Sequence, residues 1–370
     1  MKETVLITGG AGFIGSHLAD ELLAHGYKVR VLDILAPQVH GEDAKRPSYL
    51  NKEVELIRGD IRDPHALDRA LNGVDSVYHF VALVGVGQSM YQIEQYTSVN
   101  NGGTALLLEK LFKKQVRKLI VASSMSVYGE GLYRDSKGNP HTNANRPVDQ
   151  LKRRDWEVRN GTNELLRPAA TPEWKTPALA SIYALSKYDQ EQMCLIAGRA
   201  YQIPTVALRF FNVFGPNQAL SNPYTGVLAI FASRLLNHQR PIIFEDGNQL
   251  RDFVSVYDIA RACRLALETD AKDVAINVGS GASYTIRETA ERIARTLDKD
   301  IEPEITGNYR VGDIRHCYPD ISLARELLGY TPAVTLDAGL KDLATWLERQ
   351  KAPDRFHEMQ SELALRGLVV

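Results

Sequence analysis

Short runs of β-forming residues alternate with stretches of helical periodicity through the first half of the chain. Buried strands are predicted at Val5–Thr8, Lys28–Asp33, Val54–Gly59, Ser76–Val81, Lys118–Ala122 and Thr205–Phe210. Helices are predicted between them, including Ile14–His25, Pro64–Leu71 and Thr104–Lys114. Since strands that alternate with helices pair in parallel, this order predicts an α/β protein with a doubly wound parallel sheet.

A glycine-rich turn follows the first predicted strand and opens the first predicted helix. Gly9, Gly12 and Gly15 have the spacing Gly-x-x-Gly-x-x-Gly. The first glycine permits a tight turn, the second lets backbone N–H groups approach a pyrophosphate, and the third allows close packing of helix and sheet. Asp33, at the end of the second strand, can accept both hydroxyls of an adenosine ribose and would repel a 2′-phosphate. The pattern predicts a Rossmann-like fold that binds NAD in preference to NADP, although Asp33 alone is also compatible with a solvated strand end.

The pattern of the chain changes after Asn212, where scattered helices and short strands replace the regular alternation. We expect residues 1–212 to form the NAD-binding domain. Residues 213–370 are expected to form mainly a smaller substrate-binding lobe, with some segments returning to the first domain. Residues 134–180 combine prolines, Asn-rich patches and charges without clean periodicity. They are interpreted as a long insertion, either an ordered flap near the active site or a mobile surface excursion.

Composition argues against several classes of protein. A net charge of -1 over 370 residues gives no broad positive field for nucleic acid. No apolar stretch of about 18 residues and no signal peptide is seen, so we expect a cytoplasmic enzyme without a membrane segment. Cys194, Cys263 and Cys317 lie far apart and lack a Cys-x-x-Cys pairing, which argues against a disulfide framework or a metal site.

Tyr183 and Lys187 are candidates for chemistry on an alcohol, because their spacing places both on one face of a helix. Oxidation of an alcohol needs a base for the hydroxyl proton, and a tyrosine with a pKa of about 10 is too weakly ionised unless a nearby cation favours the phenolate. Ser124 leaves a predicted central strand at the carboxyl edge of the sheet, where such folds bind ligands. Taken singly, the Tyr–Lys pair is also compatible with a helix surface, and the serine with a polar strand exit.

Further motifs occur in the order found in one enzyme family. They are Thr8–Gly15, Asp60-Ile61, His79–Ala82, Asn100 with Gly103-Thr104, Ser123–Gly129, Tyr183 with Lys187, Leu208–Pro216, Arg251–Val254 with Asp258, and Asn277–Gly281. Together they resemble the extended short-chain dehydrogenases/reductases that epimerise or dehydrate nucleotide sugars. The resemblance extends from about Lys2 to Glu348, interrupted by the insertion.

The resemblance implies roles for matching residues. Tyr183 is implied as the base, Ser124 as the partner that orients the substrate, and Lys187 as the residue that holds the nicotinamide ribose and lowers the phenol pKa. Besides the glycines and Asp33, the implied cofactor ligands are Phe13, Ile14, Asp60, Ile61, Val81, Ala82 and Asn100.

The implied substrate ligands are Ser124, Ser126, Asn212, Arg251 and Arg310. The last three would compensate the charge of a diphosphate. Arg310 depends on the short match Arg310-Val311-Gly312-Asp313, and its alternative interpretation is a surface salt bridge.

The residues after Ser124 bear on the type of reaction. In the family, 4,6-dehydratases carry an Asp-Glu pair at this point and decarboxylases keep a Glu, because elimination needs an additional acid and base. This chain has Met125-Ser126. A 4-epimerase is therefore predicted, in which hydride leaves C4, the 4-keto sugar turns over, and hydride returns to its other face.

The substrate is less constrained than the reaction. The insertion separates Tyr128 from Tyr183, and the segment from Arg167 to Glu191 resembles the dTDP-L-rhamnose 4-epimerase branch of the family. We therefore expect dTDP-L-rhamnose as substrate and dTDP-6-deoxy-L-talose as product. The alternatives are a UDP-glucose/UDP-galactose-type 4-epimerase, a 4,6-dehydratase or reductase, and a non-catalytic NAD-sensing protein. The resemblance also implies a homodimer through the Leu106–Phe112 and Gln192–Ala200 helices.

Overall fold

The computed structural model describes residues 3–41, 45–219, 226–310, 312–350 and 356–369, with the backbone alone at 356–359. Val311, within one of the motifs above, lies outside the described residues. Among the helices described, none has the length and apolar character needed to cross a membrane.

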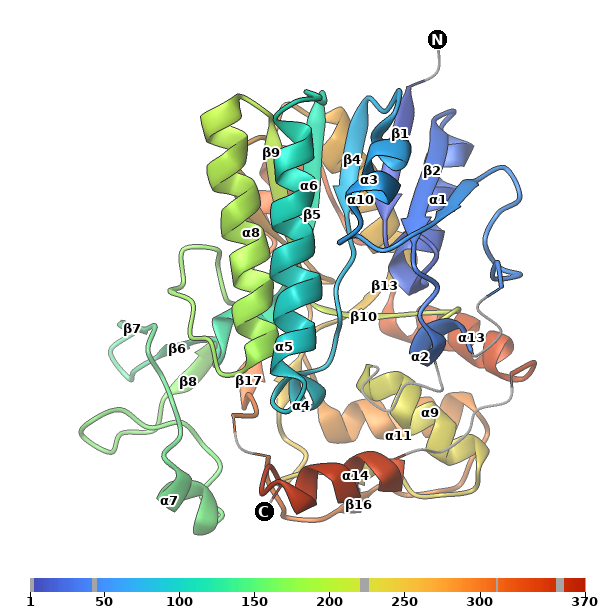
Figure 1. Ribbon diagram of the computed structural model, residues 1–370. Coiled ribbons are helices and arrows are strands. Elements are labelled where there is room, and N and C mark those ends of the chain that lie inside the picture. The colour runs from blue at the N-terminus through green and yellow to red at the C-terminus, as the bar shows by residue number, and fades with distance from the viewer. Residues whose placement is uncertain (1–2, 42–44, 220–225, 311, 351–355, 370) are drawn as a thin grey trace.

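A seven-stranded sheet forms the centre of the larger part of the molecule (Figure 1). Its strands, in spatial order, are β14 (Val274–Val278), β9 (Thr205–Phe210), β5 (Lys118–Ser124), β4 (Ser76–His79), β1 (Thr4–Thr8), β2 (Lys28–Asp33) and β3 (Glu55–Arg58). All neighbouring pairs are parallel. The strand order reverses between β1 and β4, and in such sheets ligands bind at the carboxyl ends beside this switch point.

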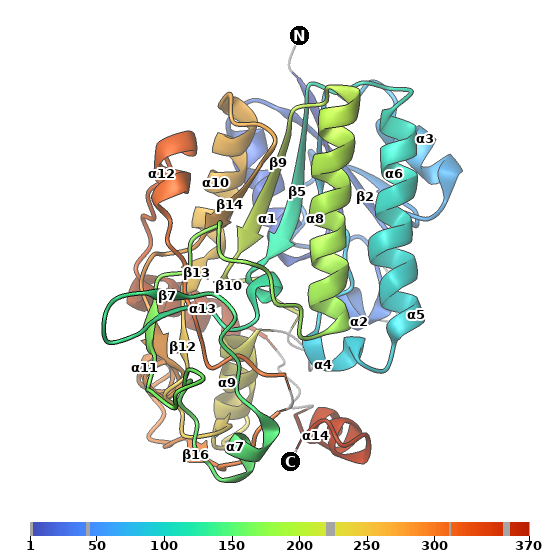
Figure 2. The same cartoon turned by 90° about the vertical axis from the view of Figure 1, so that its left-hand side faces the viewer.

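Helices cover both faces of the sheet (Figure 2). One face packs on α1 (Phe13–Ala24), α10 (Val256–Glu268) and α12 (Ser322–Leu328). The other packs on α3 (Pro64–Leu71), α6 (Gly103–Leu111) and α8 (Ile182–Tyr201). The strands are apolar on both sides because each face is covered, as with the fully buried Val5 and Leu6. The α/β, doubly wound, Rossmann-like fold is thereby confirmed.

A smaller lobe lies next to the sheet and has its own apolar core. Its principal helices are α9 (Val227–Leu236), α11 (Ile286–Thr296) and α13 (Leu336–Leu347). Its short strands are β10 (Asn212–Phe214), β11 (Ile242–Ile243), β12 (Leu250–Arg251), β13 (Phe253–Ser255), β15 (Tyr284–Thr285), β16 (Glu304–Ile305) and β17 (His316–Cys317). The C-terminal helix α14 (Phe356–Leu365) lies beside this lobe (Figure 1).

The insertion carries its own elements. Strand β6 (Leu132–Arg134) pairs antiparallel with β7 (Pro140–His141) and β8 (Arg167–Ala169). A short helix, α7 (Val148–Lys152), lies between them in the chain. An isolated bridge joins Thr171 to Pro319, so the end of the insertion contacts the segment that follows β17.

Candidate active site

The glycine-rich turn forms a backbone cradle between β1 and α1. Gly9 has a φ of +72°, and a Cβ there would lie 2.9 Å from the Val81 nitrogen, so this position requires glycine. A Cβ on Gly15 would lie 2.5 Å from the Gly10 Cα, which explains the close approach of helix and turn. Gly12 caps α1 without a side-chain hydrogen bond, and Phe13 and Ile14 begin the helix. The helix therefore presents free N–H groups to an anion, and the cradle fits a dinucleotide pyrophosphate.

Asp33 stands at the edge of this cradle. Its carboxylate accepts hydrogen bonds from the Ala11 nitrogen (3.1 Å) and the Leu35 nitrogen (2.8 Å). The residue is 8% exposed, and His40 Nε2 lies 3.8 Å from one of its oxygens. A fixed carboxylate beside the glycine turn fits an adenosine ribose.

The other predicted cofactor ligands lie at or after the carboxyl ends of neighbouring strands. After β3, Asp60 pairs with Arg62 at 2.6 Å, and hydrogen bonding to this guanidinium lowers the Asp60 pKa. Ile61 packs in the core, so its side chain is engaged away from solvent. Val81 and Ala82 follow β4 in the chain. They precede Leu83, whose backbone Asn100 binds.

Asn100 is fully buried in η1 (Thr97–Gly102), a π-helical segment before α6. Its amide oxygen accepts from the Leu83 nitrogen (2.7 Å), and its Nδ2 donates to the Ser186 hydroxyl (2.9 Å). Asn100 therefore ties the chain after β4 to the catalytic helix α8. Single π-helical turns inside helices are frequent at functional sites.

Three hydroxyl groups meet where β5 ends and α8 begins. Ser126 Oγ donates to Ser124 Oγ at 2.9 Å, and the Ser124 side chain lies close enough to the Tyr183 phenol to lower its pKa. Ser181 caps α8 through the Ala184 nitrogen and so fixes the start of the helix that carries the phenol. Burial raises the pKa of Tyr183, and the Ser124 side chain opposes the rise.

Lys187 lies one turn further along α8 and is 3% exposed. Burial lowers the pKa of its ammonium to about 8. Its Nζ donates to Gln190 Oε1 at 2.7 Å, and Gln190 Nε2 donates to the Val81 carbonyl (3.2 Å) and to Thr104 Oγ1 (2.9 Å). Gln190 thus links Lys187 to the end of β4, a role that the sequence analysis missed although its spacing from Lys187 places both on one helix face.

A buried ion pair stabilises the contact between the end of β5 and α8. The sequence analysis did not predict this role. Arg209 on β9 pairs with Glu191 on α8 at 2.6 Å. Glu191 accepts from Ser123 Oγ (2.6 Å), and Arg209 donates to the Tyr128 hydroxyl (2.8 Å). The pair therefore fixes the strand exit that carries Ser124 against the helix that carries Tyr183.

Met125 and Ser126 occupy the positions after Ser124. Met125 is 7% exposed and packs with Val127, Tyr128, Phe211 and Cys317 in an apolar cluster. A buried thioether at this point supplies no proton donor or acceptor of the kind that elimination needs.

The predicted diphosphate ligands lie in the smaller lobe. Asn212 begins β10, and its amide oxygen is buried without a partner among the described residues. Arg251 on β12 donates to the carbonyls of Leu250 (2.9 Å), Arg315 (3.0 Å) and Ile314. The Arg310 guanidinium lies 4.3 Å from the centre of the Phe244 ring. Its Nε is buried, again without a partner in the described part of the chain.

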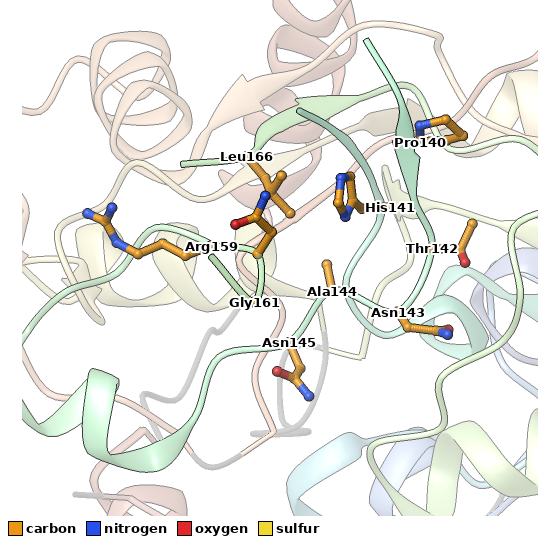
Figure 3. A pocket seen from close by; sticks show the side chains of 10 residues that line it. Pro140, His141, Thr142, Asn143, Ala144, Asn145, Arg159, Gly161 and Leu166 are labelled. Carbon is orange, nitrogen blue, oxygen red and sulfur yellow. The ribbon is translucent and has the colours of Figure 1, made fainter. Parts of the chain in front are cut away.

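A polar pocket of about 400 Å³ lies on the insertion and contains none of the predicted site residues (Figure 3). His141, Asn143 and Asn145 line it from one stretch of the insertion, and Arg159 and Asn160 from another. It is therefore separate from the hydroxyl groups at the carboxyl edge of the sheet.

Comparison with known proteins agrees with this geometry. A model of the NAD dependent epimerase/dehydratase family matches residues 5–151 and 166–279. A dTDP-L-rhamnose 4-epimerase from Burkholderia thailandensis is 35% identical over 353 residues, which cover 94% of this chain and 95% of that protein. A putative UDP-glucose 4-epimerase from Methanocaldococcus jannaschii is 33% identical over 347 residues, covering 93% and 98%.

Solved structures are similar over the same length. UDP-glucose 4-epimerase from Thermotoga maritima, determined with UDP-glucose, aligns with a TM-score of 0.77 and 30% identity over 94% of this chain and 99% of that one. The Thermus thermophilus UDP-glucose 4-epimerase complex with NAD aligns with a TM-score of 0.75 and 30% identity, covering 94% and 100%.

Proposed function

This chain belongs to the NAD dependent epimerase/dehydratase family and is an NAD-dependent isomerase of its nucleotide-sugar 4-epimerase type; we propose that its substrate is dTDP-L-rhamnose, which it converts to dTDP-6-deoxy-L-talose. The observation that carries the reaction type is the meeting of Ser124, Ser126 and Tyr183 beside a buried methionine. These side chains can transfer one hydroxyl proton. Met125 and Ser126 stand where 4,6-dehydratases carry the carboxyl pair that elimination needs.

In the proposed cycle, Tyr183 takes the proton of the C4 hydroxyl and later returns it, while Ser124 orients the reacting oxygen. The glycine turn, Asp33 and Lys187 would hold NAD, which would supply hydride exchange at C4. Because burial raises the Tyr183 pKa, the phenolate needs a cation nearby. Lys187 and the positive ring of the bound cofactor are proposed to supply that charge.

The sugar is proposed to be held mainly through its diphosphate, so that the ketone is free to turn over. Asn212, Arg251 and Arg310 are the proposed ligands. The partnerless buried Nε of Arg310 supports this assignment, because a buried donor without an acceptor costs free energy that a diphosphate oxygen would recover.

Two observations support the choice of a dTDP-6-deoxy-L-hexose. The relative from Burkholderia thailandensis is a dTDP-L-rhamnose 4-epimerase and aligns over 94% of this chain. The family model leaves residues 152–165 unmatched, and these lie inside the long insertion. A UDP-hexose is the second candidate, because the structural neighbours include UDP-glucose 4-epimerases.

The test is to incubate the pure protein separately with dTDP-L-rhamnose, UDP-glucose and GDP-mannose. NMR would report the C4 configuration, and absorbance at 340 nm any net NADH. We expect inversion at C4 of dTDP-L-rhamnose without net NADH. Preferred turnover of UDP-glucose would overturn the substrate, and stoichiometric NADH would indicate a dehydrogenase.

We also propose a cytoplasmic homodimer that contacts neither nucleic acid nor membrane. Its interface would include the outer faces of α6 and α8, which lie side by side in both views (Figures 1 and 2). Most leucines of the Leu106–Phe112 stretch pack inward on the sheet. On α8, the large apolar residues that remain exposed are Leu185, Ile196 and Tyr201, which are 42%, 57% and 46% exposed.

A further inference from the structure

We propose that the insertion positions the diphosphate ligand Arg251 through a network of ion pairs centred on the buried Arg315. The inference rests on the proposed function, because it takes Arg251 as a ligand of the substrate. It assigns Arg146 and Glu157, both within residues 134–180, as positioning residues that act through the chain segment 313–316.

Arg315 is the centre of the network and has a fully buried side chain. Its guanidinium pairs with Glu157 of the insertion at 2.5 Å and with two carboxylates of the smaller lobe, Glu245 at 3.0 Å and Asp246 at 2.6 Å. Glu157 also lies 3.2 Å from His316 Nε2. One carboxylate of the insertion therefore fixes two consecutive side chains of the smaller lobe.

Arg146 forms a second connection from the insertion, and its side chain is 3% exposed. It donates to Glu130 (3.2 Å), to Glu245 (2.7 Å) and to the carbonyl of Asp313 (3.0 Å). Glu130 in turn accepts from the backbone nitrogen of Arg315 (2.8 Å). Arg146 thus holds the backbone of the segment 313–316 directly on one side and through Glu130 on the other.

The same segment is what orients Arg251. The Arg251 guanidinium donates to the carbonyls of Ile314 and Arg315, and Asp313 Oδ1 lies 3.7 Å from it. Strand β12, which carries Arg251, pairs with β17, which begins at the last residue of this segment. A shift of residues 313–316 would therefore move the acceptors that aim the guanidinium.

Arg315, Arg146 and Glu245 form the buried centre of the network, with side chains 0%, 3% and 2% exposed, whereas the Glu157 side chain at its edge is 38% exposed. Removing one charge next to this buried centre changes the balance of the charges that remain, so these groups must rearrange. Arg251 would bind the diphosphate equally in the ground state and in the transition state. Its misplacement should accordingly weaken substrate binding without slowing the chemical step.

The test compares Glu157→Gln and Arg146→Lys with a matched control, Glu164→Gln. The Glu164 carboxylate lies in the same insertion but accepts from Ser136 and Asn160 within it. We expect each network variant to raise KM for the sugar nucleotide about tenfold, with kcat and NAD affinity within about twofold of wild type. The control Glu164→Gln should leave KM, kcat and NAD affinity unchanged.

A purely structural role would lower the thermal midpoint and the fraction of active enzyme while KM stayed constant. That result, or an equal rise of KM in Glu164→Gln, would overturn the proposal. If the network variants do not fold, hydrogen exchange of the wild-type protein decides, with dTDP and UDP as probes. We expect either nucleotide to protect residues 250–252, 313–316 and 146–157 together.

Protection confined to residues 250–252 would refute the coupling and leave the proposed function standing. If neither nucleotide protects residues 250–252, the assignment of Arg251 as a diphosphate ligand fails, and the inference fails with it. The two failures are therefore distinguishable in one experiment.

Discussion

The phenol of Tyr183 is the group on which the proposed chemistry depends, and the protein alone disfavours its ionisation. Burial raises its pKa, and the Lys187 ammonium is bound to Gln190. We propose that the charge of a bound cofactor, in addition to Lys187, favours the phenolate at this position. Proton transfer would then depend on the presence of oxidised cofactor, as expected for a cycle that begins with hydride removal.

Replacing Tyr183 with phenylalanine should lower kcat by about 10²- to 10⁴-fold, because the site loses its base while its apolar packing persists. NAD affinity, measured by equilibrium titration, should stay within about threefold of wild type. Tyr188→Phe is the matched control, since Tyr188 lies on the same helix and packs against the apolar cluster around Met125. Near-normal turnover of Tyr183→Phe would refute the assigned base.

The residues that can be predicted from the sequence without the family resemblance are those whose relation depends on local spacing. Tyr183, Lys187 and the three glycines fall into this group, because a helix repeat or a turn sets their relation. Gln190 and the Glu191–Arg209 pair were missed, since their function depends on contacts with β4, β5 and β9 that join distant parts of the chain. The roles of the cofactor and substrate ligands stay predictions until a complex is measured.

At the scale of elements, the main sheet was largely predictable. The strands Lys28–Asp33 and Thr205–Phe210 and the helix Pro64–Leu71 have the bounds that the sequence predicts. Strand β14 was not predicted, because Val274–Val278 follows an irregular stretch and joins the sheet by pairing with the distant β9. Hydrophobic periodicity reflects local structure only, so it does not show that a strand pairs with another strand far away in the chain.

The insertion is the element whose arrangement was least predictable. Its three strands are two or three residues long, and charged groups rather than an apolar pattern hold it to the lobe. Hydrophobic periodicity is accordingly weak along residues 134–180. The sequence therefore leaves two alternatives open, and the contacts of the buried Arg146 and of Glu157 with the smaller lobe support an ordered insertion.

The ionic contacts of the insertion predict a specific dependence of stability on pH. The hydrogen bond from His316 lowers the Glu157 pKa to about 2, assisted by Arg315 and opposed by partial burial. Since the folded-state pKa lies below the usual value of about 4.5, ionised Glu157 stabilises the fold above that value. This stabilisation is lost as the pH falls from about 4.5 towards 2.

The measurement is denaturant unfolding of wild type and Glu157→Gln at several pH values between 7 and 2.5. We expect the difference in the free energy of unfolding to be constant above about pH 5 and to shrink at lower pH. Asp149→Asn serves as control, because the Asp149 side chain is 84% exposed on the same insertion. A difference for Glu157→Gln that does not change with pH would contradict the role of its charge.

At the scale of the whole molecule, the two parts meet at the carboxyl edge of the main sheet. The larger part carries the cradle and the hydroxyl groups, and the smaller lobe carries the proposed diphosphate ligands Asn212, Arg251 and Arg310. The insertion contacts the smaller lobe although it follows β5 of the main sheet in the chain, with only the helical turn Met125–Tyr128 before β6. The helix α8 that carries Tyr183 also exposes Leu185 and Ile196 on its outer face. We propose that two subunits associate through this face.

The proposed dimer predicts that Ile196→Asp yields a monomer. In a twofold interface the same surface of both subunits is in contact, so one substitution places two charges in a desolvated contact. Ile196 is 57% exposed on α8, and Phe112 stacks on Tyr201 at 3.7 Å beside it, which extends the apolar surface. Val148→Asp is the control, because Val148 is a comparably exposed apolar residue on the insertion.

Size-exclusion chromatography with light scattering checks this prediction, and we expect a dimer for wild type and Val148→Asp and a monomer for Ile196→Asp. The monomer should keep NAD binding, since the cradle lies between β1 and α1, whereas α8 packs on β5 and β9. A wild-type monomer would exclude the dimer itself. A dimer that survives Ile196→Asp would instead place the interface on another surface, and the exposed apolar face of α8 would then need a different explanation.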